Sequence, residues 1–175
     1  MIFVCTGSAT VLYNSSSEVF YNPVQILNRD LSVTVLRVWD RLRRQCATEK
    51  DIKRAWARRW KRDSDSRPHI PPEELNSYKD LPGLEILEAL SASGLRSVRY
   101  AKEVPNIDSI MVNDLDKAAY DCIQRNVEFN GLDTEKIKPS IADANDVMFE
   151  HRHPQKQFDV VDLDPYGTAS PFIGT

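Results

Sequence analysis

From Pro82-Gly83 onward, short apolar runs alternate with stretches of helical periodicity. The predicted strands lie at Leu84–Leu90, Ile110–Val112, Ile137–Ile141 and Phe158–Asp164. Strands of this kind, separated by helices, form parallel sheets that are covered on both faces. We therefore expect an α/β domain with a mostly parallel, Rossmann-like sheet, of which residues 81–175 supply the first four strands. Pro139 in the third run predicts that this strand lies at an edge.

Two helices are expected between these strands, at Leu95–Val104 and at Asp116–Asn130. Pro105 ends the first, because the residue before a proline is disfavoured in helical conformation. Gly131 ends the second, because glycine readily adopts the left-handed conformation that closes a helix.

Residues 1–42 are expected to form short extended pieces followed by one helix. Asn22 is a good N-cap, Pro23 suits the first helical position, and Gln25 sits where a capping box requires it. Aliphatic residues then recur at three- and four-residue steps, which predicts one buried stripe. The stripe comprises Val24, Leu27, Leu31, Val35, Val38 and Leu42.

Residues 43–80 interrupt this pattern, and we interpret them as a basic insertion made of one charged helix and a polar loop. Between Arg41 and Arg62 there are ten Lys and Arg residues against two acidic ones, although the whole chain has a formal net charge of -3. Such asymmetry indicates a polyanionic partner, with a solvated charged face as the alternative. Trp56 and Trp60 either stack on nucleic acid or pack against their own domain.

Several classes of protein are disfavoured by the composition. No apolar run approaches the roughly 18 residues that a membrane helix needs. The cysteines Cys5, Cys46 and Cys122 are too widely spaced for a CxxC metal site or a disulfide framework. The segment His151–His153 has no thiol nearby in sequence and only one adjacent carboxylate, so we expect a solvated loop and no metal.

Ligands of open parallel sheets bind beyond the carboxyl ends of the strands. Small residues and carboxylates gather at these ends, in the segments Ser91–Gly94, Asn113-Asp114, Ala142–Ala144 and Asp162–Gly167. The Ser91–Gly94 turn allows close approach of a ligand to a helix N-terminus, but it is not the GxGxxG of dinucleotide sites. Asp114 stands where a carboxylate accepts ribose hydroxyls, and a helix-capping role is the alternative.

Asp164, Pro165 and Tyr166 are the candidates for catalysis. The exocyclic amine of a purine is a poor nucleophile, because its lone pair is delocalised into the ring. A carboxylate that accepts an N–H of this amine localises the lone pair, and an aromatic ring can hold the base by stacking. The sequence Asp-Pro-Tyr therefore predicts methylation of an amino group on a base, whereas an ordinary turn explains Asp-Pro alone.

Four segments in the same order resemble the tRNA (guanine-N2)-dimethyltransferase family: Glu18–Gln25, Asn28–Leu31, Leu87–Ser97 and Asp162–Thr168. The resemblance extends over about residues 7–172 apart from the insertion. It implies a class I S-adenosylmethionine-dependent methyltransferase domain, which transfers methyl groups from S-adenosyl-L-methionine to the N2 amine of guanosine at tRNA position 26.

The resemblance also implies roles for individual residues. Arg29 and Arg96 are similar to arginines at the methyl-donor site, and Asp114 resembles the ribose-binding acid. Asp143 and Ala144 stand where the adenine of the donor is bound, and Glu88 lies near its methionine end. Asp164 matches the catalytic carboxylate, with Pro165 and Tyr166 shaping the guanine pocket.

The chain departs from the family pattern in two ways. Thr6-Gly7 replaces a Glu-Gly pair, and the family continues past the Asp-Leu-Asp-Pro motif with further strands and a C-terminal tRNA-binding domain. Residues 1–175 are thus expected to be a partial methyltransferase domain, truncated after the fourth strand and inactive alone, whose full-length form is a monomer. The insertion resembles that of eukaryotic members, which implies the nucleus or the mitochondrion.

Two alternatives stay open at this point. One is another amino methyltransferase of the same fold, acting on adenine or on a protein amide; such enzymes more often carry Asn/Asp-Pro-Pro-Tyr. The other is a non-catalytic fragment that only binds RNA or a protein partner.

Overall fold

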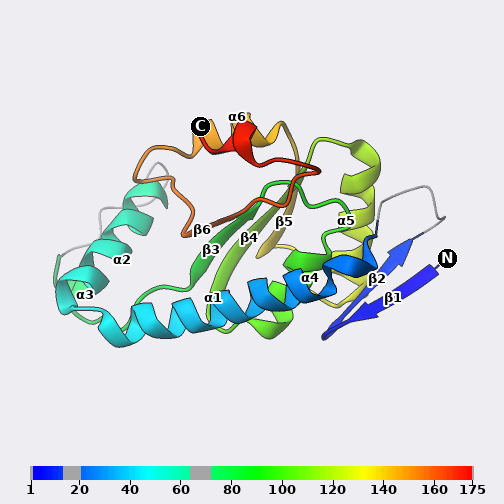
Figure 1. Cartoon of the computed structure of the whole chain (residues 1–175). Helices are drawn as coiled ribbons and strands as arrows, with labels where there is room; N and C mark the ends of the chain where they lie inside the picture. Colours follow the sequence, from blue (N-terminus) through cyan, green and yellow to red (C-terminus); the bar gives the residue numbers. More distant parts are fainter. Residues whose placement is uncertain (1, 14–20, 64–71, 175) are drawn as a thin grey trace.

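The computed structural model describes residues 2–13, 21–63 and 72–174. Its centre is a parallel sheet of four strands in the order β5-β4-β3-β6 (Figure 1). The strands are β3 (Leu84–Glu88), β4 (Ile107–Asp114), β5 (Ile137–Ile141) and β6 (Val160–Asp162). The predicted α/β fold with a parallel sheet is confirmed, and Pro139 lies in a strand at one edge of this sheet, as expected.

Helices cover both faces of the sheet. On one face lie α1 (Ile26–Cys46), α4 (Leu95–Glu103) and α5 (Lys117–Phe129), whose buried side chains share a core with Ile86 and Ile110. The opposite face is covered by α6 (Ala144–Glu150), where Leu87 packs against Val147. Figure 1 shows α1 and α6 on opposite sides of the strands. Helix α6 was not predicted from the sequence.

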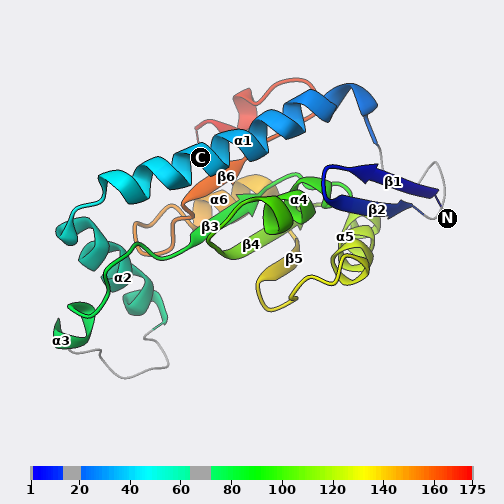
Figure 2. The same ribbon diagram turned by 90° about the horizontal axis from the view of Figure 1, so that it is seen from below.

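The N-terminal residues form an antiparallel hairpin of β1 (Ile2–Thr6) and β2 (Ala9–Tyr13), which lies beside α5 (Figure 2). Val11 is fully buried against α4 and α5. The side chain of Asn126 accepts a hydrogen bond from the backbone N–H of Leu12 at 2.7 Å, which fixes the hairpin on α5. The hairpin therefore packs against α4 and α5, on their side away from the strands' core.

The predicted start of the first long helix is confirmed. Asn22 caps the short turn η1 (Pro23–Gln25), and its side chain accepts a hydrogen bond from the N–H of Val24 at 3.0 Å. Gln25 does not act as the predicted capping box suggests: its side-chain oxygen accepts a hydrogen bond from Asn28 at 2.7 Å, along the helix. Helix α1 then runs past the predicted boundary at residue 42 to Cys46.

The predicted buried stripe of this helix is wrong. All six of its residues are exposed, from Val38 at 39% to Val24 at 84%. The buried face instead carries Arg29, Val33, Leu36 and Asp40. At about 100° per residue, these positions lie roughly half a turn away from the predicted stripe. Helix α1 therefore has aliphatic residues on two opposite sides. The side that packs against the domain is the one with fewer of them.

The expected basic helix is present as α2 (Glu49–Asp63), followed by the short α3 (Pro72–Leu75). Buried Arg59 fastens α2 to the amino ends of the strands, through Asp108, through the carbonyl of Gly83 and through Asp159 at 3.1 Å.

The two tryptophans of α2 pack within the domain. The rings of Trp56 and Tyr78 stack with centroids 4.2 Å apart, and Trp60 meets Tyr78 edge-on. Of the two readings of these tryptophans, packing is the one this structure favours. Across the described ranges, no helix combines the length and the apolar character needed to cross a membrane.

Candidate functional site

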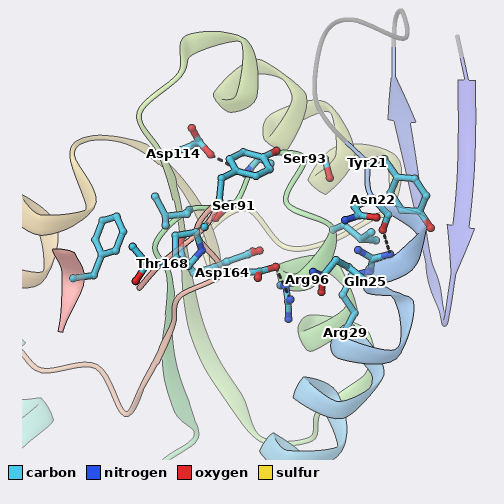
Figure 3. A pocket seen from close by; sticks show the side chains of 18 of the residues that line it. Tyr21, Asn22, Gln25, Arg29, Ser91, Ser93, Arg96, Asp114, Asp164 and Thr168 are labelled. Atoms are coloured by element: carbon cyan, nitrogen blue, oxygen red, sulfur yellow. Dashed lines mark hydrogen bonds and ion pairs between the residues drawn. The ribbon is translucent and has the colours of Figure 1, made fainter. Parts of the chain in front are cut away.

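A cavity of about 900 Å³ opens at the carboxyl ends of β3, β4 and β6, next to the start of α1. Its walls come from four parts of the chain that are far apart in sequence (Figure 3). They are lined by Tyr21, Asn22, Gln25, Arg29, Glu88, Leu90, Ser91, Ala92, Ser93, Leu95, Arg96, Asp114, Asp164, Pro165, Tyr166, Gly167, Thr168, Pro171 and Phe172. The cavity lies where the strand order predicts a ligand site, because β3 is flanked by β4 on one side and β6 on the other.

The turn between β3 and α4 forms the floor of the cavity. Ala92 and Gly94 both have positive φ, of 50° and 72°, which lets the backbone bend sharply into the helix. A side chain at Gly94 would also press on Ile123, since an added Cβ would lie 3.3 Å from it. Fully buried Asn113 donates hydrogen bonds to the carbonyls of Ala89 and Ala142, at 3.1 and 2.9 Å. It thereby holds three strand ends in register around the cavity.

Asp114 ends β4 and lines the cavity beside this turn. One of its carboxylate oxygens accepts the N–H of Ala92 at 2.8 Å, and the other accepts that of Asp116 at 3.0 Å. The N-cap of α5 is Asp116, whose side chain accepts the N–H of Ala118. Asp114 is therefore not the helix cap that formed the alternative reading, and each of its oxygens keeps a lone pair for a ligand.

Arg29 reaches the cavity from the buried side of α1. Its guanidinium donates to the carbonyl of Asn22 at 3.1 Å and lies over the ring of Tyr21, 5.0 Å from the centroid. The side chain is 6% exposed, and its Nε has no hydrogen-bond partner within the described part of the chain. A buried donor without an acceptor is unfavourable, so this corner of the cavity is suited to an anionic group.

Arg96 projects from the first turn of α4 towards the end of β6. Its Nη2 donates to Asp164 at 2.6 Å, and its Nη1 donates to Ser32 of α1 at 2.8 Å. Burial alone would lower the pKa of Arg96, but the carboxylates of Asp162 and Asp164 outweigh it and raise the pKa. Arg96 therefore stays charged and joins α1, α4 and the segment after β6.

Glu88 is a buried carboxyl group that also lines the cavity. It lies opposite Asp162 in the register of β3 and β6, and it accepts hydrogen bonds from the backbone N–H and the hydroxyl of Ser97. Burial and the neighbouring charge of Asp162 raise the pKa of Glu88 to about 8. At neutral pH its carboxyl group is thus largely protonated and adds little negative charge to the site.

The segment after β6 forms the outer wall. Asp164 and Pro165 lead to Tyr166, which is 79% exposed and lines the cavity near Asp114. Partial burial and the charges of Asp114 and Asp164 raise the pKa of Tyr166, so its hydroxyl keeps its proton. Phe172, in the turn η2 (Ser170–Phe172), closes the far side. This wall offers a carboxylate next to an aromatic ring.

Seven of the nine predicted site residues line this one cavity, and two do not. Arg29, Glu88, Arg96, Asp114, Asp164, Pro165 and Tyr166 are brought together. Asp143 instead caps α6 by accepting the N–H of Asn145 at 2.7 Å. Ala144, the first residue of α6, is buried in the core between this helix and the sheet.

The sequence did not single out Tyr21, Asn22 and Gln25 as site residues, although the structure places them in the cavity wall. Only their position in the turn before α1 brings them there. The Asn22 side chain also serves as a helix cap, and helix-capping chemistry was the signal that the sequence offered for it.

In the segment His151–His153, the first histidine has a structural role. The ring of His151 lies 4.6 Å from that of Phe158, and its Nδ1 is 2.7 Å from the carbonyl of Val147. Across the described ranges, no group of three or more metal-ligating side chains is present.

Comparison with known proteins gives a consistent result. The family model for N2,N2-dimethylguanosine tRNA methyltransferase matches residues 3–175. The chain is 41% identical over 176 residues to the mitochondrial tRNA (guanine(26)-N(2))-dimethyltransferase of Saccharomyces cerevisiae, covering 95% of this chain and 31% of that protein. It is 37% identical to the human tRNA (guanine(26)-N(2))-dimethyltransferase, covering 97% of this chain and 28% of that protein. This chain therefore spans about a third of the length of these relatives.

A solved structure agrees with these sequence relatives. Trm1 from Pyrococcus horikoshii, in a complex with S-adenosyl-L-methionine, superposes with a TM-score of 0.65 at 29% identity. The match covers 96% of this chain and 37% of that chain. With the parallel sheet, the cavity at its strand ends and a family match along nearly all of its residues, this chain belongs to the N2,N2-dimethylguanosine tRNA methyltransferase family.

Proposed function

We propose that this chain carries the methyl-transfer site of a tRNA (guanine(26)-N2)-dimethyltransferase, which moves methyl groups from S-adenosyl-L-methionine to the exocyclic N2 amine of a guanosine. The observation that carries the proposal is that Asp164, Pro165 and Tyr166 line the same cavity as Asp114 and Arg29. Residues suited to a base and residues suited to a nucleoside-type donor thus share one space. The reaction named for the relatives supports this assignment.

The charged groups of the cavity fit the methyl donor. We assign the methionine carboxylate to Arg29, because its buried Nε has no acceptor in the described part of the chain. A charge-assisted hydrogen bond there would remove the cost of that buried donor. We assign the ribose hydroxyls to Asp114, whose oxygens keep free lone pairs at the end of β4.

Four further residues complete the proposed donor site. Glu88 and Arg96 line the cavity near the methionine end. Asp143 and Ala144 are assigned to the adenine by resemblance to the family alone, since they lie outside the cavity walls. When bound, the donor supplies a methyl group attached to a positively charged sulfur.

The Asp164 carboxylate accepts an N–H of the guanine amine in this proposal. It would thereby concentrate the nitrogen lone pair for attack, and it would take up the proton that is released as the N–C bond forms and the sulfur–methyl bond of the donor breaks, leaving a neutral thioether. The Asp164 side chain is 39% exposed, so the proton can pass on to water. Tyr166 provides an exposed ring on which the guanine can stack, and Pro165 restricts the backbone that leads to this residue.

The substrate and setting are proposed in the same way. We propose tRNA as the partner and a monomer as the working form of the intact protein. We further propose that it acts in the nucleus or the mitochondrion, which the basic insertion and the mitochondrial name of the yeast relative support.

The test is single-turnover methyl transfer by the intact protein, with Asp164→Asn as the variant. We expect donor and tRNA binding to persist while the transfer rate falls by roughly 10²-fold or more, the usual contribution of a general base. Asp121→Asn, in an exposed ion pair on α5, is the matched control. Transfer at the wild-type rate in Asp164→Asn would remove Asp164 from the chemistry.

The substrate is tested with two tRNAs that carry guanosine or adenosine at position 26. Transfer to the guanosine alone is expected. Transfer to the adenosine would identify the protein as an adenine methyltransferase. Donor and RNA binding without any transfer by the wild-type protein would favour the non-catalytic alternative.

A further inference from the structure

Tyr100 is a buried phenol below the catalytic cavity that the proposed reaction does not use. It lies one turn after Arg96 on α4 and is 1% exposed. Its hydroxyl donates a hydrogen bond to Oδ2 of Asp162, at the end of β6. Burial, reinforced by the charge of Asp162, raises the pKa of Tyr100, so the phenol keeps its proton. The hydroxyl is therefore a permanent donor to Asp162.

The position of Asp162 matters because two carboxylates lie beside one guanidinium. Arg96 is 2.6 Å from Asp164 but 3.9 Å from Asp162, which is too far for a hydrogen bond. Both Arg96–Asp164 and Tyr100–Asp162 are thus satisfied pairs. If the phenol hydroxyl were absent, the carboxylate of Asp162 would lose its donor. Its nearest cationic donor would then be Arg96.

We infer that Tyr100 is a positioning residue for methyl transfer: by holding Asp162 it leaves Arg96 to orient the carboxylate of Asp164. The inference rests on the proposed role of Asp164. Arg96 is anchored on its other side by the hydroxyl of Ser32 at 2.8 Å, so its guanidinium has little freedom as long as Asp162 stays in place. A carboxylate that must meet a weakly nucleophilic amine gains from such fixed orientation.

The test compares Tyr100→Phe with the wild-type intact protein. Phenylalanine keeps the buried ring and removes only the hydroxyl. In the variant, Asp162 is expected to turn towards Arg96 and draw it away from Asp164. We expect the single-turnover transfer rate at saturating donor to fall by about tenfold, with the KM for tRNA changed less than twofold. Tyr120→Phe, on the solvent side of α5, is the control for loss of a hydroxyl.

A rescue variant separates positioning from packing. In Tyr100→Phe combined with Asp162→Asn, the neutral amide no longer attracts the guanidinium, so Arg96 is expected to return to Asp164 and the rate to recover by several-fold over Tyr100→Phe. A purely structural role for Tyr100 predicts the opposite, because the second substitution would add to the damage. A double variant slower than Tyr100→Phe, or a Tyr100→Phe protein with weakened donor binding and an unchanged rate, would overturn the inference.

Crystal structures of the wild type and of Tyr100→Phe give a readout that does not depend on activity. The Arg96–Asp164 contact should lengthen and an Arg96–Asp162 contact should form. An unchanged Arg96–Asp164 pair would overturn the positioning role, whether or not the protein methylates tRNA. Failure of the wild type to methylate tRNA would instead contradict the proposed function and leave this structural test intact.

Discussion

Glu88 is a carboxyl group almost without access to solvent, 3% exposed at the end of the central strand. Its pKa is raised from 4.5 to about 8 by burial and by Asp162. Between these two values the unfolded chain binds fewer protons than the native protein at this residue, so unfolding becomes easier as the pH rises. Each pKa unit corresponds to about 1.4 kcal/mol, and the contribution of Glu88 to stability should fall by several kcal/mol from pH 4.5 to pH 8.

We therefore predict that Glu88→Gln removes a pH-dependent loss of stability between pH 5 and pH 8. Denaturant unfolding of the intact protein, measured across this range, should show a declining free energy of unfolding in the wild type and a flatter profile in the variant. Glu103→Gln is a control in which stability changes with pH in the opposite direction. The hydrogen bond from Arg99 helps to lower the pKa of Glu103 to about 2. The stability that Glu103 contributes is present above pH 4.5 and is lost as the pH falls towards 2. Parallel profiles for the wild type and Glu88→Gln would refute the assignment.

Asp114 carries the second prediction at this scale. If its carboxylate binds the donor's ribose, Asp114→Ala should weaken donor binding about tenfold or more, since a hydrogen bond to a charged group contributes about 1.5–3 kcal/mol. Isothermal titration calorimetry with S-adenosyl-L-methionine measures this. Asp116→Ala, two residues away, removes the N-cap of α5 and should cost about 1 kcal/mol of stability without a change in donor affinity. Equal donor affinity in folded Asp114→Ala would exclude Asp114 from the site.

At the scale of elements, the sheet was predictable and the faces of α1 were not. The strands β3 and β5 begin at the expected residues, Leu84 and Ile137, because each is a short segment with apolar residues outside the helical stretches, which local pattern detects. The buried face of α1 contains Arg29 and Asp40, whose burial depends on partners far along the chain, such as Asn106, which donates to Asp40 at 2.9 Å. Periodicity weighs only apolar residues, so it selected the opposite face.

The site was predicted to a similar extent. Residues that follow strands could be placed from the sheet rule alone, which is why Asp114 and Asp164 meet in one cavity. The positions of Tyr21 and Gln25 in the cavity wall could not be predicted in this way, because they depend on how α1 crosses the sheet. The hydrogen bond between Tyr100 and Asp162 joins a helix to a strand 62 residues later, and no local pattern announces it.

The basic helix α2 leads to a prediction about RNA. Arg59 is buried among carboxylates and Arg58 pairs with Asp159 at 2.6 Å, so these two are structural more than RNA-facing. Arg54 and Lys61, together with Arg58, line a second cavity of about 500 Å³ between α2 and residues 154–159. If they contact tRNA phosphates, Arg54→Gln with Lys61→Gln should reduce the slope of log affinity against log salt by about two units.

The comparison variant for this measurement is Arg59→Gln. Removing Arg59 leaves Asp108, Asp159 and Glu85 without their shared cation, so roughly 3 kcal/mol of stability should be lost. Under conditions in which Arg59→Gln is folded, its slope of log affinity against log salt should match that of the wild type. An unchanged slope in the Arg54 and Lys61 double variant would show that these two residues are exposed to solvent and do not contact tRNA.

The described residues have a layered build, and an apolar surface of α1 is left uncovered among them. The sheet is enclosed by α1, α4 and α5 on one face and by α6 on the other (Figures 1 and 2). The outer side of α1 carries the apolar stripe from Val24 to Leu42, in which Leu31 is 54% and Val35 is 62% exposed. The last strand of the described sheet order, β6, presents Val161 at 44% exposure. Exposed apolar patches and unpaired strand edges both promote association.

We therefore predict that residues 1–175, produced alone, are inactive and self-associate. Net stabilities of domains are only about 5–15 kcal/mol, so an uncovered stripe and an open sheet edge favour loosely packed or aggregated states over a sharp native state. Size-exclusion chromatography with light scattering, thermal unfolding and methyl transfer to unmodified tRNA measure the three expectations. A double variant on the stripe tests the cause of this self-association. Leu31→Glu with Val35→Lys should shift the chain towards the monomer, because the two substitutions place charges on the stripe.

Thr34→Glu is the control for these variants. It lies on the same helix but beside the stripe, so it adds a charge without removing an apolar side chain and should leave the association unchanged. A monodisperse wild-type chain with a cooperative melt and measurable turnover would show that the exposed face of α1 is compatible with an independent, working domain.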